Sequence, residues 1–445
     1  MSIEDYGYKQ ELKRVLSIWD LVIYGMIFMV PIAPFGVFGY IYQASGGMVP
    51  LAYLIGMVAM FFTAMSYWAM SRAFPVAGSV YTYAQRGIHE VVGFFSGWLI
   101  LLDYILIPAL LYIVSAAALR SIMPGMADWM WLLIFIAINT VINLVGVEFT
   151  AKANRYILIA EGIILAIFVV LGLVALYSGD HPTGLTLKPI YDPGAFSLPL
   201  VVGAVSIAVL SFLGFDGIST LSEETKDGPD SVGKASLLAL IVVGSLFILQ
   251  TWIAADLARG MHFSSNDTAF YETAELAGGN LLKLTAMWAT ALSWGIANAL
   301  VAQAAVSRIL FSMARDRKLP HVLAKVHPKY QTPYVSTLLV ALVSLVVGFA
   351  FIGHIDDLSR IVNFGALSGF FMLHLSVINH YMIRNKSPRW VLHLIFPLIG
   401  VIIIGYVLYE MDWPAKVIGL GWLLVGVAYY FVTTRLLKRK IALEL

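Results

Sequence analysis

Apolar runs of about 20 residues alternate with short polar stretches along the whole chain. Because a helix needs about 20 apolar residues to cross a bilayer, this pattern predicts an all-α polytopic membrane protein with about twelve transmembrane helices. The polar stretches between the spans are too short to fold separately, so we expect residues 1–445 to form a single transmembrane domain. The predicted spans begin near Ser17, Met48, Val91, Asp128, Tyr156, Leu198, Ser236, Leu281, Pro333, Leu358, Trp390 and Trp413.

The lysines and arginines are divided unequally between the two sides of this predicted membrane domain. Of the 28 basic residues, 21 fall on the side that carries both termini, six fall on the opposite side, and Arg308 falls within a span. Cytoplasmic loops of membrane proteins carry the excess of Lys and Arg. We therefore expect a multi-pass plasma-membrane protein with both termini in the cytoplasm. We also expect the long side chain of Arg308 to reach the nearby cytoplasmic surface.

The composition narrows the chemistry that the protein can perform. Hydrophobic residues make up 60% of the chain, charged residues make up 12%, and the mean hydropathy is +0.85, which excludes a water-soluble domain. The sequence has no cysteine, so disulfides and thiolate metal ligands are excluded. His89 and Glu90 begin a zinc-type H-E-x-x-H pattern, but Gly93 stands where the second histidine belongs. We expect no enzyme activity, no cofactor, no metal site and no nucleic-acid partner.

The first predicted span contains helix-breaking residues near its middle, in the stretch GMIFMVPIAPFG (residues 25–36). Here Pro31 and Pro34 flank Ile32 and Ala33. Inside hydrocarbon, the backbone groups that such a break frees must face protein, water or a ligand. One interpretation is a simple proline kink. The other is a discontinuous helix whose exposed backbone lines a substrate site.

The sixth predicted span is interrupted in a similar way. The stretch SFLGFDGISTLSEET (residues 211–225) places Phe215 and Asp216 between two glycines, Gly214 and Gly217. Paired interruptions are typical of transporters built from two inverted repeats, in which the substrate binds near the midplane of the membrane. We therefore predict discontinuous helices 1 and 6 in an inverted repeat of five helices. Its predicted binding segments contain Pro31, Ile32, Ala33, Pro34, Gly214, Phe215 and Asp216.

Three acidic residues lie inside predicted spans, where a charge is costly and usually serves a function. Asp103 is in the third span, Glu161 is in the fifth, and Asp216 is at the break of the sixth. Each carboxyl group is either neutral and hydrogen-bonded or part of a functional site. In the second case, Asp103 and Asp216 are the predicted partners of a cationic substrate. Glu161, which has only aliphatic neighbours in the sequence, is the predicted carrier of a coupling proton.

Aromatic side chains can hold a cation against their ring faces. Six aromatic residues lie, by their positions in the spans, within reach of the proposed site: Phe28, Phe35, Tyr104, Phe212, Phe215 and Trp294. We predict that Tyr104, Phe212, Phe215 and Trp294 contact the substrate, although helix packing is the main alternative for Phe212. The indole N–H of Trp294 needs a partner wherever it is buried.

Other polar residues within the spans have a structural interpretation. Asn139 and Asn143 lie four residues apart on the fourth predicted span, and His374, Asn379 and His380 lie on the tenth. Polar side chains inside membranes often form hydrogen bonds between helices. We expect these five residues to join helices and not to bind the substrate.

Several stretches of the chain match the motifs of a known transporter superfamily. The sequence resembles the amino acid–polyamine–organocation (APC) transporters, and among them most closely the bacterial putrescine importers. The matching stretches follow the family order from the second span to the tenth. They are FPVAGSVYTYAQR (74–86), GWLILLDYILIP (97–108), SFLGFDGISTLSEETKD (211–227), ARDRKLP (314–320), VHPKYQTP (326–333) and IVNFGALS (361–368).

The resemblance implies a leucine-transporter-type fold, in which two inverted repeats of five helices precede two more helices. In this chain the first repeat would cover residues 16–178, the second would cover residues 198–384, and the additional helices would cover residues 389–436. It also implies a carrier of the bacterial inner membrane that works by alternating access. Such a carrier is driven by a proton gradient or a sodium gradient.

Departures from the family pattern bear on the substrate and on the coupling ion. Amino acid carriers of this superfamily usually hold the substrate carboxylate with the backbone N–H groups of a glycine-rich turn in the first break. In this chain that stretch contains Pro31 and Pro34, which have no backbone N–H, and this favours an amine without a carboxyl group. Glu161 falls near the position where some relatives carry a lysine in place of a sodium ion. Sodium sites of this fold normally use hydroxyls on the eighth helix, which offers only Ser307 and Ser312 near its cytoplasmic end.

The sequence therefore predicts a secondary active importer of small organic cations, first of all putrescine-like diamines. It favours a proton over sodium as the coupling ion. The alternative is a proton- or sodium-coupled amino acid transporter or exchanger. A channel would need a continuous polar lining, whereas the polar residues of this chain gather at the two breaks.

Overall fold

The computed structural model describes residues 14–145, 148–178 and 184–436. Over these ranges the chain is helical and forms no strand, with one isolated β-bridge between Leu16 and Thr225. Eleven helices are long and apolar enough to cross a membrane, and the number rises to twelve when the bent pair at the start of the chain is counted as one span. The prediction of about twelve transmembrane helices in an all-α protein is thus confirmed.

The helices follow one another in the chain with short connections. In order they are α1 (Ile18–Met29), α2 (Pro34–Ser45), α3 (Val49–Ala73), α4 (Ser79–Gly87), α5 (Glu90–Ile122), α6 (Asp128–Val145), α7 (Glu148–Ser178), α8 (Leu198–Ala208), α9 (Pro229–Leu257), α10 (Ala269–Leu292), α11 (Ala299–Arg315), α12 (Tyr334–Phe351), α13 (Ile355–Val377), α14 (Phe396–Glu410) and α15 (Trp413–Phe431). Several of these helices are joined or extended by shorter 3-10 and π-helical turns. These turns include η2 (Val209–Phe212), η3 (Asp216–Leu221) and η4 (Ser293–Asn298).

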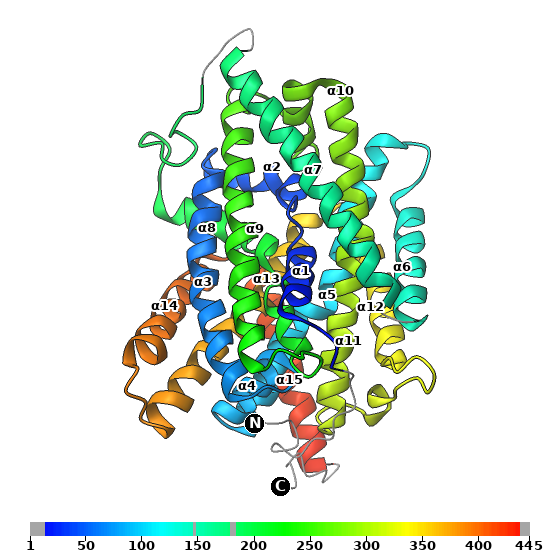
Figure 1. Ribbon diagram of the computed structural model, residues 1–445, viewed down its shortest axis with the longest axis vertical. Helices are drawn as coiled ribbons and strands as arrows, with labels where there is room; N and C mark the ends of the chain where they lie inside the picture. Colours follow the sequence, from blue (N-terminus) through cyan, green and yellow to red (C-terminus); the bar gives the residue numbers. More distant parts are fainter. Residues whose placement is uncertain (1–13, 146–147, 179–183, 437–445) are drawn as a thin grey trace.

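The helices form one bundle in which α5 is central. This 33-residue helix contacts α4, α6, α10, α11, α12, α13 and α15, and most of its side chains are buried (Figure 1). By contrast, α14 lies at the edge of the bundle in Figure 1, and both α14 and α15 expose large apolar side chains such as Ile402 and Leu424. Exposed apolar side chains are favourable in contact with lipid hydrocarbon, so these two helices are expected to face lipid.

The first predicted break is present. Helix α1 ends at Met29, α2 begins at Pro34, and the axes of the two helices differ by 53°. Val30 adopts a positive φ of 54°, which a branched side chain rarely does. Proline suits the first position of α2 because that position needs no N–H donor. The carbonyl of Pro31, freed by the break, accepts a 2.8 Å hydrogen bond from the side-chain amide of Gln250 on α9.

The second predicted break is also present. Helix α8 tightens into the 3-10 turn η2, the backbone becomes extended at Leu213, and η3 begins at Asp216. Gly214 between them has a φ of +121°, a conformation that residues with a side chain rarely adopt. The discontinuous helices 1 and 6 of the sequence prediction are therefore confirmed. The repeat boundaries at residues 16–178 and 198–384 remain predictions.

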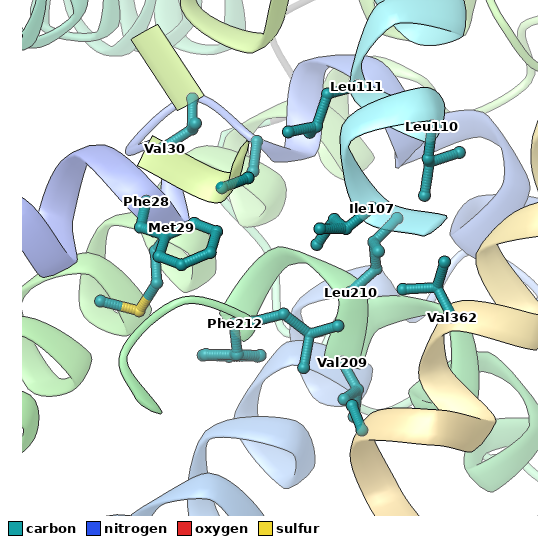
Figure 2. Close-up of a cluster of buried hydrophobic side chains, with 14 of the residues drawn as sticks. Phe28, Met29, Val30, Ile107, Leu110, Leu111, Val209, Leu210, Phe212 and Val362 are labelled. Carbon is teal, nitrogen blue, oxygen red and sulfur yellow. The ribbon is translucent and has the colours of Figure 1, made fainter. Parts of the chain in front are cut away.

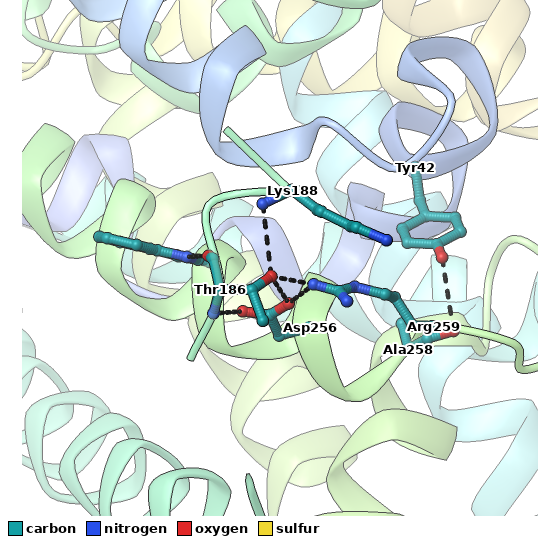
Figure 3. Close-up of polar contacts among 7 residues, drawn as sticks. Tyr42, Thr186, Lys188, Asp256, Ala258 and Arg259 are labelled. Carbon is teal, nitrogen blue, oxygen red and sulfur yellow. Dashed lines mark hydrogen bonds and ion pairs between the residues drawn. The ribbon is translucent and has the colours of Figure 1, made fainter. Parts of the chain in front are cut away.

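A buried carboxylate fixes the loop that leads to α8. Asp256, near the end of α9, accepts hydrogen bonds from the amide N–H (2.6 Å) and the hydroxyl (2.8 Å) of Thr186 (Figure 3). The indole of Trp252 donates to the carbonyl of Thr186 at 2.6 Å, and Arg259 contacts both Thr186 and Asp256. The loop that leads to α8 is thus tied to α9 although it has no regular structure of its own.

The start of α1 and the end of α15 lie toward the same end of the molecule, as an even number of spans requires. Part of the charge count that placed this end in the cytoplasm comes from residues 9–13 and 437–440, which lie outside the described residues. The cytoplasmic location of both termini is therefore still a prediction.

Candidate functional site

The two breaks pack directly against each other. A methyl group added at Gly214 would lie 2.7 Å from Cγ of Phe28, and one added at Gly217 would overlap the same ring. The absence of a side chain at both glycines thus allows the last turn of α1 to approach η3. Figure 2 shows the apolar surroundings of this contact, where side chains of α1, α5, η2 and α13 meet, among them Phe28, Ile107, Leu210, Phe212 and Val362.

Asp216 is held at the second break by two hydrogen bonds. The phenol of Tyr104 on α5 donates to Oδ2 at 2.5 Å, and the backbone N–H of Gly214 donates to Oδ1 at 3.1 Å. The carboxyl group is buried, with only 2% of the residue exposed. Hydrogen bonds to a carboxylate are stronger than those between neutral groups. The structure thus brings together Asp216 and Tyr104, two of the predicted binding residues.

Asp103 lies next to this pair. It is buried on α5, one position before Tyr104, and its carboxyl is within electrostatic range of Asp216. Its Oδ1 atom is buried and has no hydrogen-bond partner among the described residues. Helix α13 closes the site here, because a methyl group at Gly365 would lie 2.6 Å from the backbone nitrogen of Asp103. Burial of a carboxylate oxygen without a hydrogen-bond partner costs free energy. A hydrogen-bond donor from a bound molecule would therefore be favourable at this position.

Tyr67 on α3 completes the group and was not among the residues predicted from the sequence. Its phenol lies within electrostatic range of both Asp103 and Asp216 and hydrogen-bonds the hydroxyl of Ser79 at 3.1 Å. Its ring packs edge-on against Phe215 at 5.9 Å, and Phe215 in turn packs against Phe370 at 5.8 Å. The chain has 22 tyrosines, and nothing in the pattern around Tyr67 distinguishes it from the others.

Phe212 and Phe35 lie in aromatic clusters of their own. Phe212 is buried against the rings of Tyr53 (5.9 Å) and Phe247 (5.3 Å). Phe35, directly after Pro34, stacks on Phe270 of α10 with ring centroids 3.9 Å apart. Both positions therefore hold helices together at the two breaks.

Trp294 lies beside the first break. It belongs to η4, a π-helical turn between α10 and α11, and its ring faces the backbone of Gly36 on α2. Its indole nitrogen is buried and lacks a hydrogen-bond partner within the part of the chain that the structure describes. π-helical turns inside α-helices occur frequently at functional sites. The geometry thus leaves a free donor close to the start of α2.

Glu161 on α7 faces the same π-helical turn. The residue is 2% exposed, and its carboxyl lies against the hydroxyl of Ser293, the residue before Trp294. Its Oε2 atom has no hydrogen-bond partner within the ranges described above. The sequence indicated only aliphatic neighbours for Glu161, and Ser293 corrects that view. The hydroxyl comes from a helix more than 100 residues away, which the local sequence cannot reveal.

Arg308 does not extend to the surface, and the expectation drawn from its position in the sequence is wrong. Its Nε atom lies 3.0 Å from Oε1 of Glu224, and only about one seventh of each side chain is exposed. The pair lines a cavity of about 240 Å³ between α11 and the segment that follows η3. Nearby, Arg315 pairs with the buried Glu223 at 3.4 Å. Burial next to carboxylates favours ion pairing over extension to the surface.

The residues expected to join helices do so. Asn139 donates to the carbonyl of Gly295 at 2.7 Å, and Asn143 donates to the side chain of Gln303 at 2.8 Å. The remaining contacts are His374 with the hydroxyls of Ser66 and Thr63, Asn379 with the carbonyl of Gly87, and the ring of His380 with that of Phe74. These contacts connect α6 to η4 and α11, and the α13 region to α3 and α4.

Comparison with known proteins places this architecture in a family. The family model for amino acid permeases matches residues 22–413. The chain is 30% identical over 436 residues to the low-affinity putrescine importer PlaP of Escherichia coli, which covers 96% of this chain and 94% of that protein. It is 25% identical to the branched-chain amino acid permease BcaP of Bacillus subtilis and 24% identical to a methylthioribose transporter of the same organism, each over 96% of this chain and 94% of that protein.

Proposed function

We propose, from the premise that this chain belongs to the amino acid permease family of the APC superfamily, that it imports putrescine-like diamines. As a member of that family it is a membrane transporter and not an enzyme. We further propose that uptake is coupled to protons and proceeds by alternating access in a bacterial inner membrane, with both termini in the cytoplasm.

The pair of buried carboxylates, Asp103 and Asp216, carries the diamine proposal. No Lys or Arg in the described part of the chain forms an ion pair with either of them. Two carboxylates inside a membrane require compensation by protons, hydrogen bonds or cations. A diamine offers two ammonium groups joined by an apolar chain, which suits two acids among Tyr67, Tyr104 and Phe215.

The first break supports an amine without a carboxyl group. A substrate carboxylate would need free backbone N–H donors at the start of α2. The amides of Ala33, Phe35 and Gly36 are instead hydrogen-bonded within the turn, to carbonyls at 2.8, 2.9 and 3.2 Å. Pro31 and Pro34 contribute no donor at all. Among the described residues, the amide of Ile32 and the indole N–H of Trp294 are donors beside the break for which no hydrogen bond is found.

Glu161 is the proposed proton carrier. It is buried beside Ser293, in the π-helical turn that also carries Trp294, and it is not paired with a basic side chain in the part of the chain described here. Proton relays in transporters use such intramembrane acids. In this position, a change of protonation on α7 would alter the contact between α7 and the π-helical turn η4.

Transport assays with purified protein in liposomes test the proposal. An inward proton gradient should drive accumulation of labelled putrescine, and collapse of that gradient by an ionophore should stop it. Replacing external sodium by potassium should leave uptake unchanged. Accumulation that ignores the proton gradient would disprove the coupling. A lack of any diamine uptake or exchange would disprove the substrate class.

An amino acid transporter is the second candidate, favoured by the similarity to the branched-chain amino acid permease. In that case the indole N–H of Trp294 and other half-helix amides would hold the carboxylate. Competition against labelled putrescine separates the two candidates. Diamines should compete at low concentration, and neutral amino acids should not. Equal competition by leucine or alanine would favour the amino acid transporter.

A further inference from the structure

A small basic cavity lies at the ends of two apolar spans, away from the two breaks. It has a volume of about 130 Å³ and is formed by the last turns of α3 and by the start of the span that contains α14. Residues Met65, Trp68 and Arg72 line it from one face of α3, at spacings of three and four residues. Arg389, Leu392 and His393 line it from the other side.

The cavity carries an excess of positive charge. The Nε atom of Arg72 lies 3.1 Å from Asp230, which also accepts a hydrogen bond from the indole of Trp68 at 2.8 Å and pairs with Lys234 at 3.3 Å. Asp230 therefore forms ion pairs with both Arg72 and Lys234. Arg389 is exposed and lies within electrostatic range of the ring of His393. The guanidinium of Arg72 has five N–H donors, so one ion pair leaves capacity for a further anion.

The depth of the cavity matches that of a lipid headgroup. Arg72 lies at the end of the span Val49–Ala73, and Arg389 lies just before the span Val391–Glu410. Trp68 and the exposed Trp390 flank this level, and tryptophan is enriched where a membrane meets water. The connection between α13 and α14 is at the same end of the molecule as the end of α15, the side predicted to face the cytoplasm.

We propose that this cavity binds the phosphate group of an anionic membrane phospholipid. Arg72 and Arg389 would donate to the phosphate oxygens, because guanidinium groups recognise phosphate through paired N–H donors. The apolar side chains of Met65 and Leu392 would contact the first carbons of the acyl chains. Basic pockets between transmembrane helices on the cytoplasmic side are known to suit such headgroups. A lipid bound here joins α3 to the α13–α14 connection.

Titration of the purified full chain with short-chain lipids tests this site. Thermal unfolding in a neutral detergent is followed while dioctanoyl phosphatidylglycerol is added, and the lipid concentration at half-maximal stabilisation is measured. That concentration should rise about fivefold in Arg389→Gln and in Arg72→Gln, and more in the double variant. Lys386→Gln is the matched control, because it removes one positive charge from the same connection but does not line the cavity. For this control, the lipid concentration at half-maximal stabilisation should equal that of the unchanged protein.

Two further titrations identify the source of the phosphate. Dioctanoyl phosphatidylcholine should stabilise the protein less, because its choline cancels the phosphate charge. Inorganic phosphate at the same concentrations should have no effect. Equal stabilisation by inorganic phosphate would overturn the lipid assignment in favour of a soluble anion. Unchanged titrations in both arginine variants, with normal unfolding temperatures without lipid, would overturn the site itself.

Discussion

The phenol of Tyr104 donates a 2.5 Å hydrogen bond to the carboxylate of Asp216, across 112 positions of the chain. This bond joins the central helix α5 to the interrupted sixth span. The backbone N–H of Gly214 donates a second hydrogen bond to the same carboxylate. The side chain of Asp216 therefore also stabilises the backbone conformation of the break. Any movement that straightens the sixth span would have to disturb this arrangement.

Removal of either partner of this bond should impair transport. Asp216→Asn should abolish putrescine uptake, because it removes the charge that faces the ammonium. Tyr104→Phe should raise the concentration for half-maximal uptake about tenfold, as expected for the loss of one hydrogen bond to a charged group. Initial rates in liposomes measure both effects. Tyr156→Phe, an exposed position on α7, is the control, and normal transport by Asp216→Asn would contradict the proposed site.

Neutralisation of Glu161 should separate substrate binding from proton coupling. Glu161→Gln keeps the shape of the side chain but cannot release a proton. We expect this variant to exchange labelled putrescine for unlabelled putrescine at normal rates and to lose accumulation driven by the proton gradient. Glu410→Gln, at the end of α14, should retain both activities. Accumulation by Glu161→Gln at the original level would exclude Glu161 as the proton carrier.

A side chain at Gly217 should force the two breaks apart. Gly217→Ala places a methyl group into the ring of Phe28, and overpacking of this kind costs about 1–3 kcal/mol. The unfolding temperature and the rate of uptake should both fall, and Phe28→Leu in the same protein should restore part of the loss. Gly203→Ala on α8 is the control, because its methyl group meets no atom within 4 Å. Equal effects of the two alanines would contradict the contact between the breaks.

Disruption of the pair between Arg308 and Glu224 should open the adjacent cavity. The carbonyl of Glu224 also accepts the amides of Val15 and Leu16 at 3.0 Å, so the segment before α1 is attached to the same loop. The chain has no cysteine, so a single Ala304→Cys reports access to the cavity. Glu224→Gln should speed labelling by a membrane-impermeant maleimide about fivefold.

The exchanged pair, Glu224→Arg with Arg308→Glu, is the control for this measurement. It reverses the two charges but keeps their attraction, so labelling of the introduced cysteine should return toward the original rate. Slow labelling in Glu224→Gln would show that the ion pair does not hold the cavity closed.

The number of spans and the positions of both breaks could be predicted from the sequence because they depend on local chemistry. Each span needs its own run of apolar residues, whatever its neighbours are. Pro31 and Pro34 remove N–H donors where they stand, and Gly214 permits a positive φ where it stands. The acids Asp103, Glu161 and Asp216 were identified for the same reason, since a carboxyl group inside an apolar run is visible without a structure.

Only the tertiary structure decided which side chains meet. Tyr67 approaches both acids, Ser293 faces Glu161, and Arg308 pairs with Glu224, although each contact joins helices that are distant in the sequence. Such contacts depend on the rotation of each helix about its axis and on its neighbours in the bundle. Those are set by the packing of many side chains together, whereas hydropathy and helix breaking act within one segment.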